Sequence, residues 1–196
     1  PSGDTVLLLV SHQSSRLLPT IRSRCVQQAC PLPGQAMSLE WLPGALPQCS
    51  SEERVELLTL AAGSPLAAVK LQAQGVREQR ATVVAGVKKL LKRELSATQL
   101  AESWNAIPLL LLFDWFCDWS SLILRYQLTQ DESGLGLEDM RKVLQYLAQK
   151  TPQDKVLNIQ DWILAQRQKV LSKANLNRVL LLEALLVQWA SLPGQR

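Results

Sequence analysis

The stretch AIPLLLLFDWFCDWSSLIL, residues 106–124, decides what class of protein this sequence encodes. Its apolar density suggests a membrane-spanning helix at first sight. Two aspartates interrupt it, however, and one charge at the centre of a bilayer costs about 2.5–3.5 kcal/mol. Asp114, Asp118, Ser121 and Arg125 recur every three or four residues, which places them on one stripe of a helix. The pattern predicts a largely buried, amphipathic helix with a solvated polar stripe and no membrane span.

Helical patterns continue on both sides of this stretch. Ser50 with Glu53, and Ser96 with Gln99, form capping boxes that open two of the helices. Pro65 and Pro152 suit the first turn of two more. The predicted helices cover residues 35–43, 50–62, 64–75, 76–94, 96–107, 108–128, 137–150, 152–172 and 176–191. We group them into a three-helix module, 33–75, and a helical bundle, 76–196.

The first residues follow a different pattern. The apolar run TVLLLV, residues 5–10, predicts a buried strand of a parallel sheet, and residues 25–32 predict a weaker second strand. Because one strand cannot form a sheet, we expect the chain to be a fragment of a longer protein. The predicted fold is therefore mainly α, with residues 1–32 as the remnant of an α/β domain.

Composition argues against an enzyme centre within this chain. There is no phosphate-binding glycine loop, and the four cysteines and single His12 lack the spacing of a zinc site. We interpret His12 as a polar residue at the strand end, and we expect no metal, no cofactor and no catalytic site. Four thiols without a disulfide pattern and without a signal peptide fit the cytoplasm.

Two helices have surfaces that suggest partners. The last helix contains VLLLEALLV, residues 179–187, which is apolar around much of its circumference and is typical of a large core or an oligomer interface. The net charge of +4 is modest, but helix 76–94 is basic. Its cations could be solvated, face an acidic subunit or contact DNA phosphates; they are Arg77, Arg80, Lys88, Lys89, Lys92 and Arg93.

Three segments together resemble one family. VLLLVSHQSSRLLPTIRSRC (6–25), AAGSPLAAVKL (61–71) and NLNRVLLLEALLVQW (175–189) are similar, in this order, to segments of the AAA+ clamp-loader subunits of bacterial DNA polymerase III. The resemblance implies that residues 1–32 end a nucleotide-binding domain, that 33–75 form its lid and that 76–196 form the oligomerising collar.

The resemblance also implies a role for the motif Ser23-Arg24-Cys25. In this family the motif arginine projects into the ATP site of a neighbouring subunit as an arginine finger, which would be the role of Arg24. Ser23 and Cys25 would position the turn, and Ser11 occupies the sensor-1-like position. The implied partners are the gamma/tau and delta subunits, the ATP of a neighbour and, through the complex, primed DNA and the sliding clamp.

One departure from the family pattern separates its members. Subunits that hydrolyse ATP carry a sensor-2 arginine where this sequence has Leu66. This favours a stator subunit, which helps to load the clamp without hydrolysing ATP, over a gamma/tau-like ATPase fragment. An independent helical DNA-binding module is the other alternative. The family's upstream nucleotide-binding half and zinc module are not in this sequence. The role of Arg22 stays open, including pairing with a nearby carboxylate.

Overall fold

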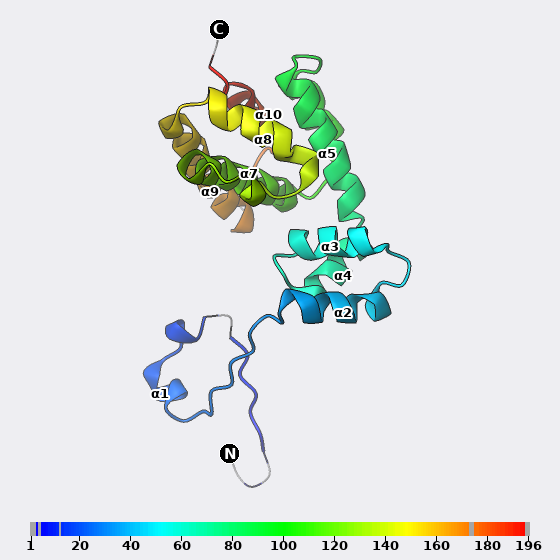
Figure 1. Cartoon of the computed structure of the whole chain (residues 1–196). Helices are drawn as coiled ribbons and strands as arrows, with labels where there is room; N and C mark the ends of the chain where they lie inside the picture. Colours follow the sequence, from blue (N-terminus) through cyan, green and yellow to red (C-terminus); the bar gives the residue numbers. More distant parts are fainter. Residues whose placement is uncertain (1–2, 4, 12, 173–174, 195–196) are drawn as a thin grey trace. The chain divides into compact units, whose positions relative to one another are not determined.

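The computed structural model describes residues 3, 5–11, 13–172 and 175–194. Every regular element among these residues is a helix, and none of them forms a β-strand, so the predicted mainly α class is confirmed (Figure 1). The chain divides into two compact units, residues 1–33 and 34–196.

The first unit contains only two short helices, the 3-10 helix η1 (Ser14–Arg16) and α1 (Pro19–Arg22). The strands predicted at residues 5–10 and 25–32 are wrong, since both segments lack regular structure. Val6 to Val10 are each 60–89% exposed. An apolar run of residues indicates that its side chains favour burial. A β-strand also needs a neighbouring strand to satisfy its backbone hydrogen bonds, and the sequence pattern does not show whether one is present. His12 lies outside the described residues.

The second unit begins with α2 (Gln35–Ala45), α3 (Ser51–Leu60) and α4 (Pro65–Ala73). Both halves of the predicted capping box at Ser50 and Glu53 are present, and Ser64 caps α4. Pro43 was predicted to end α2, but the helix continues to Ala45 because the Leu46 N–H still bonds the Leu42 carbonyl at 2.7 Å. These helices enclose a small core of Leu42, Leu46, Cys49, Leu57, Leu58 and Ala68.

The larger core belongs to six further helices. They are α5 (Val76–Leu91), α6 (Ala97–Ser103), α7 (Leu109–Thr129), α8 (Glu138–Lys150), α9 (Gln153–Leu171) and α10 (Arg178–Ala190), with the 3-10 turn η2 (Glu132–Gly134) before α8. The helix α7 packs against α8 and α9, while α10 packs on α6 (Figure 1). Among the described residues, no helix meets the length and hydropathy of a bilayer span.

Aromatic side chains join α7 to α10 at the centre of this core. The Phe116 ring lies edge-on to Trp119 and Trp189, with ring centroids 5.0 and 4.8 Å apart. Trp104, Trp119 and Trp189 are each at least 98% buried, as expected for tryptophans in apolar helical patterns. Edge-to-face pairs contribute about 0.5–1.5 kcal/mol beyond the burial of their area.

The predicted polar stripe of α7 is exposed at Asp118, Ser121 and Arg125, and part of it also contacts α9. Asp114 accepts a hydrogen bond from Arg167 of α9 at 2.5 Å, and Ser121 accepts one from Gln160 at 2.7 Å. Burial, together with the nearby charge of Asp114, raises the pKa of Asp118. The partners are 39 and 53 residues away in the chain, beyond the reach of a local pattern.

One buried cation connects three helices. Arg80 of α5 is only 5% exposed. Its guanidinium donates two hydrogen bonds, of 2.9 and 3.0 Å, to the carboxylate of Asp139 in the first turn of α8. It also lies over the rings of Trp115 and Trp119 of α7, 6.0 and 5.5 Å from their centroids. A bidentate carboxylate and two aromatic rings together compensate for the lost hydration of this charge.

Removing one member of this ion pair should destabilise the protein more than removing both members. Asp139→Ala leaves the Arg80 charge buried without its partner and should lower the free energy of unfolding by about 3–5 kcal/mol. Adding Arg80→Met removes that charge, so the double variant should be more stable than Asp139→Ala alone. Urea unfolding measures both. Glu138→Ala, which breaks the exposed pair with Arg141 on the same helix, should cost less than about 1 kcal/mol. A double variant less stable than Asp139→Ala would contradict the assignment.

A close approach of α5 to α6 gives a second prediction. A Cβ at Gly86 would come 2.6 Å from Trp104 and 2.9 Å from Leu100, so only glycine fits. Gly86→Ala should destabilise the protein by about 1–3 kcal/mol through overpacking, despite the better helix propensity of alanine. Gly44→Ala in α2 is the matched control, since a Cβ there meets nothing within 4 Å. It should be neutral or stabilise by up to about 1 kcal/mol. Equal thermal stability of the two variants would refute the steric reason.

Candidate functional site

The predicted Ser-Arg-Cys motif forms a short helical turn in the first unit. Pro19 begins α1, where a missing N–H costs no helical hydrogen bond. The Ser23 N–H then donates to the Pro19 carbonyl at 2.9 Å, and the Arg24 N–H donates to the Ile21 carbonyl at 3.1 Å. The Ser23 hydroxyl donates to the Thr20 carbonyl at 3.3 Å. These bonds hold the backbone of Ser23 and Arg24 in a defined turn.

The side chain of Arg24 is exposed and uncommitted. Within the described part of the chain, neither Arg24 nor Arg22 forms an ion pair or a side-chain hydrogen bond. The local carboxylate that was one possible partner of Arg22 is therefore not found among those residues. A guanidinium in this state keeps all five N–H donors available for an external carboxylate or phosphate.

The other predicted site residues surround this turn in sequence. Cys25 follows it as an exposed free thiol. Ser11 lies in the extended segment before η1, where its hydroxyl accepts a hydrogen bond from the Gln13 N–H at 3.1 Å. The structure thus places Ser23, Arg24 and Cys25 on one turn, and no hydrogen bond joins Ser11 to that turn among the described residues.

Leu66 is the residue for which the resemblance predicts an arginine in ATP-hydrolysing subunits. It is the second residue of α4, directly after Pro65, and it is 66% exposed. An exposed leucine supplies neither charge nor hydrogen-bond donor to a nucleotide. No group of three metal-ligating side chains occurs in the described ranges. The exposed Cys25 and Cys30, the buried Cys49 and the half-buried Cys117 are all free thiols.

The six cations of helix 76–94 divide into two groups. Arg77 at the start of α5 donates to Glu53 at 2.6 Å and Glu56 at 2.9 Å, both on α3. Burial opposes its charge, but these hydrogen bonds outweigh the burial and raise the pKa of Arg77. Arg80 is engaged with Asp139. Sequence reasoning missed both pairs, because the carboxylates come from other helices. The remaining four cations, Lys88, Lys89, Lys92 and Arg93, are exposed.

Comparison with known proteins places these observations in a family. Residues 74–191, which include all of α5 to α10, match the family model described as DNA polymerase III, delta subunit, C terminal. DNA polymerase III subunit delta' of Pseudomonas aeruginosa is 74% identical over 194 residues, which is 99% of this chain and 59% of that protein. The subunit of the same name from Yersinia pestis is 28% identical over 193 residues, 96% of this chain and 56% of that protein.

The chain thus spans somewhat more than half the length of the relatives it matches. The resemblance of its motifs to the bacterial clamp-loader subunits, and among them to the delta-prime subunit, is confirmed by these similarities. Since the family model matches residues 74–191 of 196, the chain belongs to the family defined by the C-terminal region of the DNA polymerase III delta subunit.

Proposed function

We propose that this chain is part of a stator subunit of the DNA polymerase III clamp loader. The subunit helps to load the sliding clamp onto primed DNA, together with the gamma/tau and delta subunits, in the cytoplasm. The observation that carries the proposal is the 74% identity to a delta-prime subunit over nearly the whole chain. At this identity the helices, the caps and the Ser-Arg-Cys turn are expected to serve the same assembly.

Arg24 is the residue through which this chain acts on ATP held by a neighbour. Negative charge on the γ-phosphate oxygens must be stabilised during phosphoryl transfer, and an arginine supplied in trans does so. In GTPases such a finger accelerates the reaction by about 10³–10⁵. The exposed, unpaired guanidinium of Arg24 on a hydrogen-bonded turn supports this role. Ser23 and Cys25 position the turn, and Ser11 supplies the sensor-1-like hydroxyl.

The proposed stator role rests on the lack of a sensor-2 arginine that could contact a nucleotide bound by this subunit. Leu66 replaces the sensor-2 arginine, and an exposed aliphatic side chain cannot neutralise phosphate charge. A gamma/tau-like motor is therefore the weaker alternative. Residues 1–32 would belong to the nucleotide-binding domain and 33–75 to its lid, with no cofactor of their own.

The remaining residues, 76–196, serve as the collar that holds the subunits together. Exposed leucine and valine side chains on α10 support this part of the proposal, in particular Leu180 and Val187. They lie seven residues apart, on one face of the helix, with the half-buried Ala184 between them. Apolar side chains of neighbouring subunits would cover this face, as in interfaces that resemble a core cut in half.

The finger is tested in the reconstituted loader. Arg24→Ala should leave assembly intact and lower DNA-stimulated ATP hydrolysis by at least about tenfold, because the neighbouring γ-phosphate loses its charge partner. Steady-state ATPase and clamp-loading assays measure the effect, and gel filtration checks assembly. Arg16→Ala, at an exposed arginine of the same unit, is the control and should behave as wild type. Unchanged ATPase with Arg24→Ala would remove Arg24 from the mechanism.

The collar is tested separately by placing a charge on α10. Leu180→Asp should reduce co-purification with the other loader subunits by at least about tenfold, since an unpaired carboxylate would be buried at the interface. Leu128→Asp, at a comparably exposed leucine near the end of α7, is the control. Circular dichroism establishes that both variants keep their helices. Equal co-purification of the two variants would place the interface elsewhere.

A further inference from the structure

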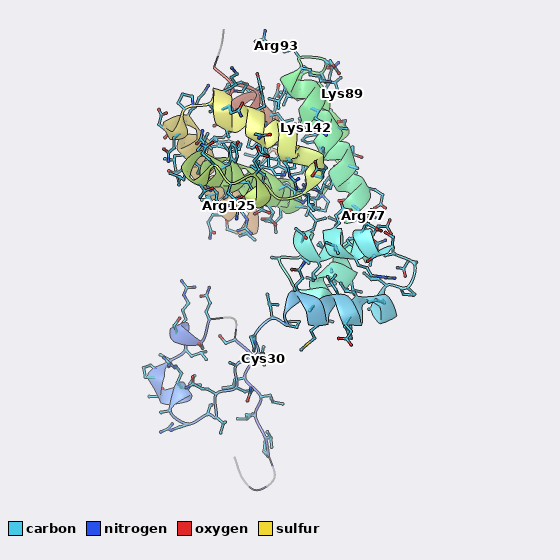
Figure 2. The ribbon with its side chains drawn as sticks, in the orientation of Figure 1. Cys30, Arg77, Lys89, Arg93, Arg125 and Lys142 are labelled. Carbon is cyan, nitrogen blue, oxygen red and sulfur yellow. The ribbon has the colours of Figure 1, made fainter. Side chains whose placement is uncertain are left out.

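The end of α5 presents a group of free cations. We call Lys88, Lys89, Lys92 and Arg93 the α5 basic end; all four are exposed. Figure 2 shows Lys89 and Arg93 at the opposite end of the helix from Arg77. Lys92 approaches Glu94 at 4.0 Å, but both side chains are more than half exposed, so this pair contributes little. The other three have no carboxylate partner in the described part of the chain.

A fifth cation comes from α8. Arg80 and Asp139 fix the start of α8 against α5, and Lys142 lies one helical turn beyond Asp139. Figure 2 shows Lys142 on α8, which packs beside α5. Lys142 is exposed and has no carboxylate partner among the described residues. The nearby Glu138 is engaged by Arg141 at 2.5 Å. The fold therefore brings cations of two helices onto one surface.

The other exposed side chains near these cations indicate which class of partner this surface can bind. The outward residues of α5 before the basic end are small or polar: Ala81, Thr82 and Ala85. No large hydrophobic side chain is exposed between Leu66 and Leu128. Protein interfaces depend on aromatic and aliphatic anchors at their centre. The helix α5 exposes none, and the exposed anchors beside it are Tyr146 of α8 and Val187 of α10, which lines the same hollow as Arg93. At the α5 basic end itself the main source of affinity is charge, which favours a polyanion over a folded protein.

The spacing of the cations fits a chain of phosphates. Lys88 and Lys92 are one helical turn apart, so about 6 Å of helix axis separates them. A nucleic acid strand carries a charge about every 3.4 Å of its axis, so several lysines along one helix can follow successive phosphates. The helix α5 has no aromatic residue to stack on bases, and the exposed aromatic side chain nearest to Lys142 on α8 is Tyr146, one turn further along.

We propose that the α5 basic end, with Lys142, binds the phosphate backbone of nucleic acid without reading its sequence. This site goes beyond the Arg24 proposal and does not depend on it, since the residues lie in the other unit of the chain. The surface would hold a nucleic acid strand against the helical bundle while Arg24 acts elsewhere.

The test compares two variants of equal net charge. Lys88→Gln with Lys89→Gln and Lys92→Gln removes three cations of the site. Lys70→Gln with Lys150→Gln and Lys169→Gln removes three exposed lysines from other surfaces. Fluorescence anisotropy of the purified chain with a labelled oligothymidylate and a labelled duplex, over a range of low salt, gives affinity and salt dependence.

The site variant should bind at least about tenfold more weakly than wild type, and the slope of log K against log salt should fall by about 2–3. The control variant should lose less than half of that effect. Equal loss in both variants would mean that only net charge matters and would overturn the site. No binding by the wild-type chain would overturn it too, as would stronger competition by polyglutamate than by unlabelled oligonucleotide.

Discussion

The second unit depends on the requirement that a buried charge be paired. Arg80 is almost completely shielded from water, and leaving it without a partner would cost several kcal/mol. Only Asp139 among the described carboxylates satisfies it, with two parallel hydrogen bonds. Because Trp115 and Trp119 cover the same guanidinium, the requirement holds α5, α7 and α8 in one arrangement. The apolar core restricts the relative orientation of these helices less, because apolar contacts have no preferred direction.

This pairing also determines which charges remain for other molecules. With α5 held by Arg80, Arg77 one turn earlier reaches Glu53 and Glu56 of α3. Glu53 uses one carboxylate oxygen for Arg77 and the other for the Ser50 N–H, so the cap of α3 and the ion pair share one residue. The first half of the basic helix is therefore structural. Its second half, beyond these carboxylates, is where cations stay exposed.

The sequence predicted what is local and missed what is distant. The capping boxes at Ser50 and Ser96 were predictable because donor and acceptor are three residues apart, and the helix bounds follow from them within a few residues. The partners of Arg80 and Asp114 are 59 and 53 residues away, and no periodicity encodes such pairs. The strand at residues 5–10 failed for the same reason, since it requires a neighbour that a local pattern cannot supply. For the candidate site, the sequence located the Ser-Arg-Cys motif. Only the three-dimensional structure could show that Arg24 forms no ion pair with a carboxylate among the described residues.

The arginines of this chain differ in whether they form an internal ion pair with a carboxylate. This difference indicates which of them can bind an external anion better than their spacing in the sequence does. Arg77, Arg80 and Arg167 each hold a carboxylate within 3 Å, so using them for an external anion would first break an internal ion pair. Arg24 and Arg93 have no such described pair, so an external phosphate competes only with water for them. Water is a weak competitor for a bidentate guanidinium contact once the site is closed to solvent. The same difference explains why the basic helix as a whole was an ambiguous signal for an anion partner, while residues 88–93 are a specific one.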